Sequence, residues 1–257
     1  MLGPILQFVV APLLVGLSTL AARRWGQHIG GTLSAFPVIV GPLLLIAAHD
    51  HGPAFAATAA CGTLLGLVAL SAFVLSYGRT APHAGWRMSL AVGWAAAAGT
   101  TALLSTVRAG PPMAMVAASA SLVVAYRLLP EHPVARRPVA PRLDLPLRMG
   151  ISALLIAALA QAASTFGPLV GGLLAALPVL ASVLAVFTHG QQGEAALISL
   201  MRGMLGGMAG FAVFCLMIAL LVERTGIPYA FVTATLAAVV VQATIVWMPR
   251  TRTAEPA

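Results

Sequence analysis

Charged residues are scarce in this chain: they make up 8% of its 257 residues, and none of them is lysine. A soluble domain carries about 25% charged residues, so this sequence cannot cover a water-facing surface. Hydrophobic residues make up 60% of it. In lipid every backbone N–H and C=O must be satisfied within the chain, and helices are the simplest way to do so. The composition predicts an all-α polytopic membrane protein whose main partner is the lipid bilayer.

The sequence also lacks the residue patterns of catalytic and metal sites. It has no H-E-x-x-H, no G-x-S-x-G and no P-loop. No Asp, Glu or His lies at the centre of a predicted membrane span, which argues against a proton relay. The two cysteines, Cys61 and Cys215, lie inside apolar stretches far from any metal-ligand spacing. We therefore predict no enzyme activity, no cofactor and no metal; the His49–His51 cluster is interpreted as a solvated loop.

The net charge of +8 comes from 14 arginines against six acidic residues. The arginines lie between apolar stretches, a pattern that reflects membrane topology rather than a nucleic-acid surface. Nucleic acid is therefore excluded as a partner. At the N-terminus, Arg23 and Arg24 follow the apolar stretch, the reverse of a cleavable signal peptide. We expect this stretch to be the first membrane helix.

Stretches of about twenty apolar residues predict membrane spans. Nine stretches of this kind occur, at residues 4–22, 30–48, 54–77, 86–107, 111–129, 146–163, 168–188, 195–222 and 227–248. With nine spans and the N-terminus outside, twelve of the 14 arginines lie on the cytoplasmic side, as the positive-inside rule requires. The C-terminus and the Pro- and Arg-rich segment 131–146 are then cytoplasmic. Aromatic residues at predicted cytoplasmic ends agree: Trp25, Tyr77, Trp86, Tyr126 and Trp247.

An internal repeat is the most informative feature of the sequence. Residues 30–45 (GGTLSAFPVIVGPLLL) align with 171–186 (GGLLAALPVLASVLAV) at an offset of 141, and the alignment continues without a gap. Seven Gly or Pro residues match, although these two types total only 43 of 257 residues. Spans one to four map onto spans six to nine, with the fifth unpaired. An odd number of crossings inverts the second half, which predicts nine transmembrane helices arranged as 4+1+4 inverted-topology repeats.

This scheme divides the chain into four parts. Residues 1–108 form the first four-helix repeat, and 109–145 a linking helix with the Arg/Pro-rich linker. Residues 146–250 form the second, inverted repeat, and 251–257 a short cytoplasmic tail.

The repeated motif G-G-x-L-x-A-x-P supplies the first candidate binding residues. Pro37 and Pro178 each remove a helix hydrogen bond, and the freed carbonyls can coordinate an ion or a polar substrate or simply mark a packing kink. Ser34 is the only hydroxyl in the segments Ser34–Pro37 and Ala175–Pro178. We expect these two segments to meet near mid-depth.

Three other polar residues inside spans complete the candidate substrate site: Thr101, Arg202 and Gln242. Thr101 and Gln242 are equivalent in the repeat and could face one cavity from opposite halves. An intramembrane arginine is a functional candidate, although Arg202 lies close enough to a helix end to reach the interface instead. The G-x-x-x-G pairs Gly62/Gly66 and Gly203/Gly207 predict close helix packing.

The stretch GGLLAALPVLASVLAVFTHGQQGEAALISLMRG resembles the GlpM-like family of small bacterial membrane proteins. The resemblance covers residues 168–212 and, more weakly, 27–71. Members of that family are about half as long, so this chain is similar to a duplicated version of them. The resemblance implies a bacterial inner-membrane location and carries over no catalytic residue.

Two functions fit this sequence. The first is a permease for a small solute or ion that works by relative movement of the two halves. The alternative is a non-transporting accessory or scaffold protein of the cell envelope. A polar, water-accessible cavity between the halves favours transport, and a dry interface favours the scaffold.

Overall fold

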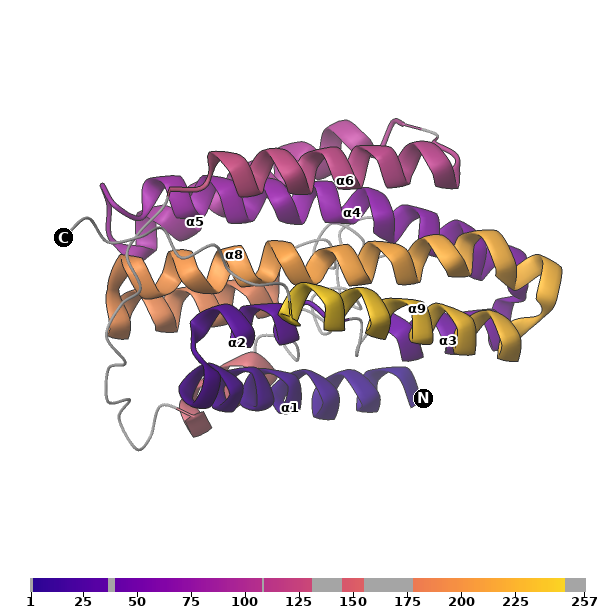
Figure 1. Ribbon diagram of the computed structural model, residues 1–257, viewed down its shortest axis with the longest axis horizontal. Coiled ribbons are helices and arrows are strands. Elements are labelled where there is room, and N and C mark those ends of the chain that lie inside the picture. The colour runs from indigo at the N-terminus through magenta and orange to yellow at the C-terminus, as the bar shows by residue number, and fades with distance from the viewer. Residues whose placement is uncertain (1, 37–39, 108, 131–144, 155–177, 248–257) are drawn as a thin grey trace.

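A computed structural model of the chain describes residues 2–36, 40–107, 109–130, 145–154 and 178–247. All regular structure in these ranges is helical, and the helices lie roughly side by side in an elongated bundle (Figure 1). The predicted all-α fold class is confirmed for these residues.

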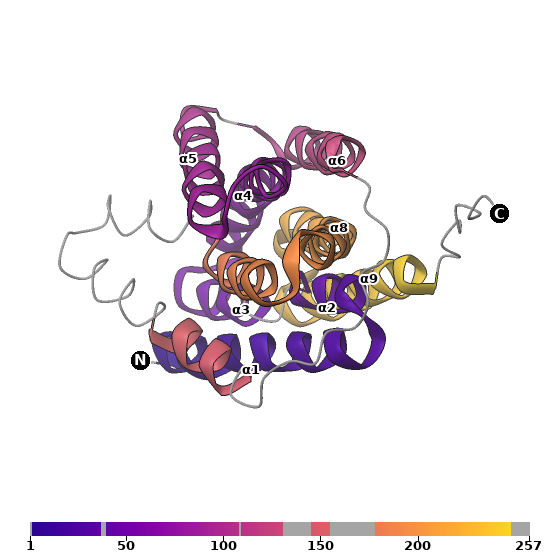
Figure 2. The same ribbon diagram turned by 90° about the vertical axis from the view of Figure 1, so that its left-hand side faces the viewer.

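Four of the described helices are long and apolar enough to cross a membrane. They are α4 (Pro53–Thr80), α6 (Pro111–Leu128), α8 (Val179–Thr225) and α9 (Ile227–Trp247). The other helices with labels are α1 (Leu2–Trp25), α2 (Gln27–Ser34), α3 (Val40–His51) and α5 (Trp86–Leu104). A shorter helix, Leu145–Leu154, lies beside α1 (Figure 2).

The predicted second span, 30–48, is divided between two helices in the structure. α2 has 8 residues and α3 has 12. At 1.5 Å per residue, neither helix alone reaches across a hydrocarbon core of about 30 Å. The helical hydrogen bonds of α2 end at Ser34, three residues before Pro37, where proline favours a break. Pro37 itself lies outside the described residues.

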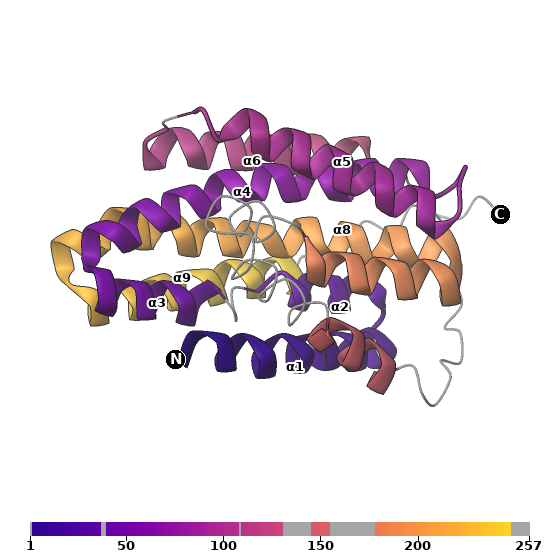
Figure 3. The same cartoon turned by 180° about the vertical axis from the view of Figure 1, so that it is seen from behind.

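Helix α8 is a hairpin of two limbs that reverses at Gly193, as Figure 3 shows. Gly193 has φ 81° and ψ −179°, and Gly52, which joins α3 to α4, has φ 89° and ψ 166°. This backbone region is open essentially to glycine alone. Glycine is therefore required at both reversals, and both reversals have nearly the same shape.

The second limb of α8, from Glu194 to Thr225, is the centre of the bundle. It packs against α2, α4, α6 and α9. Its closest contact is with α2, where backbone meets backbone: a Cβ at Gly203 would overlap the carbonyl oxygen of His28, and one at Gly207 would overlap that of Thr32. Gly31 of α2 lies equally close to the carbonyl oxygen of Leu200. We refer to this region as the α2–α8 contact.

The other G-x-x-x-G pair behaves differently. Gly62 and Gly66 on α4 are exposed, and no atom of the described residues lies within 4 Å of a Cβ built on either. The prediction of close packing is therefore confirmed for Gly203 and Gly207. For Gly62 and Gly66 it stays a prediction, because residues 168–175, the counterpart of α2 in the repeat, lie outside the described residues.

Most of the described arginines gather at one end of the bundle, where α1, α4 and α6 end and α5 begins (Figure 1). They include Arg23, Arg24, Arg79, Arg87 and Arg127. We refer to this as the arginine-rich end; the turns at Gly52 and Gly226 lie at the opposite end.

Aromatic rings also lie at the arginine-rich end of the bundle. Trp25 and Tyr126 are exposed there, and Trp86 is close to half-exposed. Tyr77 differs from the prediction of an interfacial ring, because it is fully buried and its hydroxyl lies 3.4 Å from Nδ1 of His189. Packing against the first limb of α8, rather than the bilayer surface, determines its position.

Candidate functional site

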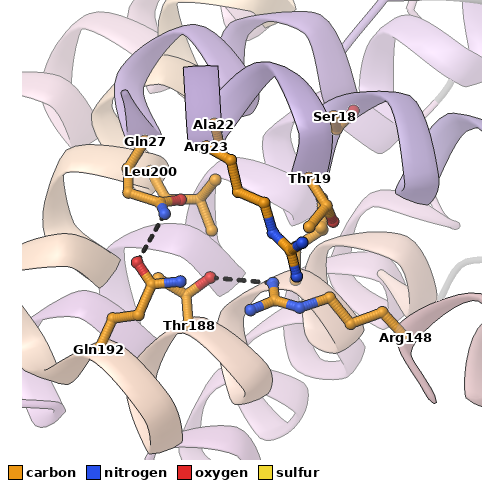
Figure 4. A pocket seen from close by; sticks show the side chains of 10 residues that line it. Ser18, Thr19, Ala22, Arg23, Gln27, Arg148, Thr188, Gln192 and Leu200 are labelled. Carbon is orange, nitrogen blue, oxygen red and sulfur yellow. Dashed lines mark hydrogen bonds between the residues drawn. The ribbon is translucent and has the colours of Figure 1, made fainter. Parts of the chain in front are cut away.

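A small polar cavity lies among α1, α2, the helix Leu145–Leu154 and both limbs of α8, near the arginine-rich end (Figure 4). Two arginines, two glutamines and three hydroxyl residues give it its polarity. Its lining residues are Ser18, Thr19, Ala22, Arg23, Gln27, Arg148, Leu184, Thr188, Gln192 and Leu200. We refer to it as the polar cavity.

Helix α1 contributes the first face of the polar cavity. Ser18 and Ala22 are four residues apart, as are Thr19 and Arg23, so each pair lies on one side of the helix. Arg23 is half-buried, whereas Arg24, one residue on, is exposed and lies against the Trp25 ring. The helical rotation places the two arginines on different sides of α1, and the packing of α1 on its neighbours makes the side of Arg23 the inner one.

Arg148 enters the polar cavity from the helix Leu145–Leu154. It is only 2% exposed, and a buried guanidinium is costly unless its donors are satisfied. It donates hydrogen bonds to Thr188 Oγ1 at 3.3 Å and to Gln191 Oε1 at 3.4 Å. Its guanidinium carbon lies 5.2 Å from the centre of the Phe187 ring. Contacts on two sides thus fix the plane of this guanidinium.

Two glutamines join α2 to α8 at the edge of the polar cavity. Gln27 Nε2 donates a hydrogen bond of 2.7 Å to Gln192 Oε1. Gln27 is the first residue of α2, directly after the turn at Gly26, and Gln192 directly precedes the reversal at Gly193. Two glycine turns therefore bring these amides together.

Ser18 is a buried polar residue that lines the cavity. Its hydroxyl is 1% exposed and has no hydrogen-bond partner among the described residues. It lies seven residues before the end of α1 at Trp25, which places it roughly 10 Å inside the bundle along the helix axis. A buried hydroxyl without a partner costs about 1–3 kcal/mol, so this position favours a bound polar guest.

The polar cavity is small. The space open to the centre of a water-sized sphere is about 10 Å³, close to the minimum that holds one water molecule. Its side chains are guanidinium, amide and hydroxyl groups, and guanidinium does not give up its proton in proteins. This chemistry binds polar solutes by hydrogen bonds and positive charge.

The repeated motif is only partly visible in the structure. Ser34 ends α2, and its hydroxyl donates to Gly31 O at 2.7 Å. The Pro178 carbonyl accepts hydrogen bonds of 2.8 Å from both N and Oγ of Ser182, the first of which is the ordinary first bond of α8. The carbonyl that Pro178 leaves without a donor lies about one turn earlier. That carbonyl and the predicted meeting with Ala175 lie outside the described residues.

Arg202 lies away from the polar cavity, at the end of α6. Its guanidinium donates to Leu129 O at 2.9 Å and to Pro130 O at 3.3 Å, and lies 5.0 Å from the centre of the Tyr126 ring. These bonds satisfy carbonyls that every helix C-terminus leaves without partners in its own helix. Its position points to a structural role.

Thr101 and Gln242 do not come together. Thr101 is on α5, and α4 and α8 lie between α5 and α9 (Figure 2). Gln242 is buried on α9, and its Nε2 donates to the carbonyl oxygen of Thr32 on α2. The second polar atom of this side chain, Oε1, is buried without a partner in the described part of the chain. Gln242 thus lies beside the α2–α8 contact, whereas Thr101 lies on the other side of α4 and α8.

Sequence reasoning missed the residues of the polar cavity because it assigned their arginines to topology. One signal was available: Ser18, Thr19 and Arg23 lie on one side of an otherwise apolar helix. The partners of Arg23 from other helices could not be found in this way.

Comparisons of the chain with protein-family models, curated proteins and solved structures found no match. Among the described residues, no group of three His, Cys, Asp or Glu side chains is placed to hold a metal ion.

Proposed function

We propose that the chain is a multi-pass permease of the bacterial inner membrane for a small solute or ion. The observation that carries this proposal is the polar cavity: buried donors from three segments of the chain converge on it inside an otherwise apolar bundle. Polar groups are costly at membrane depth and are usually kept there for function.

Two halves in opposite orientation are the architecture proposed for this permease. At the offset of 141, Gly52 corresponds to Gly193 and Gly85 to Gly226, and each of these glycines directly precedes or separates helices. The two reversals with matching φ and ψ lie at opposite ends of the bundle (Figure 1). This relation supports inverted repeats.

The full scheme has nine crossings as 4+1+4, with α6 as the unpaired fifth. In this scheme α2 and α3 together form the broken second crossing. The arginine-rich end faces the cytoplasm by the positive-inside rule, which places the N-terminus outside and the C-terminus inside. The polar cavity then lies on the cytoplasmic side of the membrane.

Relationship to the GlpM-like family stays a proposal that rests on the sequence stretch 168–212. It would make this chain a duplicated form of those small membrane proteins.

A non-transporting scaffold is the second candidate, and the α2–α8 contact favours it. Backbone lies against backbone there at Gly31, Gly203 and Gly207, which leaves no room for water or solute. A scaffold needs only such dry packing, so the polar cavity is the feature that separates the two candidates.

Transport can be tested with purified protein in liposomes. Stopped-flow light scattering would follow the entry of a panel of small neutral, anionic and cationic solutes. The permease predicts that at least one solute enters faster than in protein-free vesicles. If every solute enters at the protein-free rate, with the protein folded and inserted, the scaffold function stands instead.

A further inference from the structure

The guanidinium groups of Arg23 and Arg148 approach the polar cavity from different helices and point toward one another in Figure 4. Both residues are arginine in a chain that contains no lysine. Arginine stays protonated at all physiological pH values and is less strongly hydrated than lysine, which suits it to anions inside a protein. Both guanidinium groups therefore keep their positive charge over the whole physiological pH range.

The side chains around these arginines are arranged to hold an anion in place. Thr188 and Gln191 orient the Arg148 guanidinium by hydrogen bonds, so little reorganisation is needed on binding. The Ser18 hydroxyl, which has no partner among the described residues, is a further donor in the lining. Cations are bound by carboxylate and carbonyl oxygens, whereas the charged side chains that line this cavity among the described residues are both guanidinium groups.

The size of the cavity limits the guest further. Space for about one water molecule, 10 Å³, is too little for a sugar, an amino acid or a nucleotide. A small inorganic anion is the charged guest that requires the least widening of the cavity. Leu184 and Leu200 line the remaining wall, and apolar surface favours anions that lose their hydration shell easily.

We propose that the polar cavity is a binding site for a small inorganic anion, held between Arg23 and Arg148, with Ser18 as a further polar group of its lining. In so far as this anion is the solute that crosses the membrane, the inference rests on the permease function proposed above. Binding itself does not depend on transport.

The test uses the full-length protein purified in detergent, with sodium chloride and sodium nitrate as probes in a sodium gluconate buffer of constant ionic strength. Isothermal titration would measure Kd. We expect saturable binding, with Arg23→Gln and Arg148→Gln each raising Kd at least about tenfold, because each removes a buried charge from the site. Arg23→Lys should retain part of the affinity.

Arg24→Gln is the matched control, because it removes the same charge from the next residue of the same helix, outside the cavity. Its Kd should stay within about twofold of the wild type, since an exposed charge is screened. Ser18→Ala gives a neutral second variant in case Arg148→Gln fails to fold, and it should weaken binding several-fold.

Three results would overturn the anion site: no saturable binding of either probe, folded Arg23→Gln and Ser18→Ala variants with wild-type Kd, or an equal loss in Arg24→Gln. The liposome assay tests the permease function separately from the anion site. Arginine-dependent binding without flux of any solute keeps the site and removes the permease. Flux of a neutral solute or a cation without anion binding keeps the permease and removes the site.

Discussion

Gly203 and Gly207 lie against the backbone of α2, whereas Gly62 and Gly66, at the same spacing on α4, have no described atom within 4 Å of an added Cβ. The two pairs are equivalent in the sequence repeat. Glycine spacing permits a second helix to approach closely, but it does not supply that helix. The comparison teaches that the glycine spacing provides a smooth helix face in both halves, whereas the partner comes from elsewhere: α2 packs on Gly203 and Gly207, and the counterpart of α2, residues 168–175, lies outside the described residues.

The largest effect is expected at the α2–α8 contact. Gly203→Ala places a methyl group on the carbonyl oxygen of His28, which is backbone and cannot rotate away. Overpacking of this kind should cost about 3 kcal/mol of unfolding free energy. Thermal unfolding of the purified protein in detergent would measure it. Wild-type stability of Gly203→Ala would show that α2 does not pack here.

The second-largest loss of stability is expected at Arg202, one residue before Gly203. Arg202→Ala removes charge-assisted bonds to Leu129 O and Pro130 O, so stability should fall by about 2 kcal/mol. Arg202→Lys should retain part of it. Because Arg202 lies outside the polar cavity, anion affinity should not change. If Arg202→Ala weakened anion binding but kept wild-type stability, Arg202 would belong to the binding site and its structural role would be contradicted.

Alanine at Gly52 and alanine at Gly193 should lower the free energy of unfolding by similar amounts. In this respect the two reversals differ from the two G-x-x-x-G pairs. Both have a positive φ that a side chain disfavours, and neither has a described atom within 4 Å of an added Cβ. Gly52→Ala and Gly193→Ala should each cost about 1–2 kcal/mol, and the two unfolding free energies should agree within about 0.5 kcal/mol, given the similar geometry. A large difference would argue against equivalent turns.

The smallest effect is expected at Gly62. Gly62→Ala adds a methyl group at an exposed position in the interior of α4. It should leave stability unchanged or raise it by up to about 1 kcal/mol, because alanine favours a helix more than glycine does. The same unfolding measurement applies, and Gly66→Ala is a second sample of the same face. A cost like that of Gly203→Ala would mean that both pairs are packed.

Much of the helical framework could be predicted from the sequence because it depends on local properties. Apolar stretches predicted the long helices, and Pro37 predicted a break where α2 ends. The matching of Gly52 and Gly193 also came from the sequence, and their φ values give it a physical reason. These features depend on each residue's own backbone and on the hydrophobicity of its near neighbours in the sequence.

The site could not be predicted in the same way because it depends on contacts between distant residues. Arg23 and Arg24 look identical in sequence, and only the packing of α1 against α2 and α8 decides which one is half-buried. Arg148 reaches the same cavity from a helix more than a hundred residues away. For Arg202 the end of α6 determines the role; the sequence predicts where that helix ends but not that Arg202 lies beside it.

The central claim is that the two halves cross the membrane in opposite directions. His49 and Gly190 are exposed, equivalent positions at the offset of 141, each three residues before a reversal. Single cysteines there, in a chain with Cys61 and Cys215 replaced by alanine, can be tested with a membrane-impermeant maleimide in intact spheroplasts and in inverted vesicles. The account predicts that His49→Cys reacts only in spheroplasts and Gly190→Cys only in inverted vesicles. Labelling of both positions from the same side would contradict it.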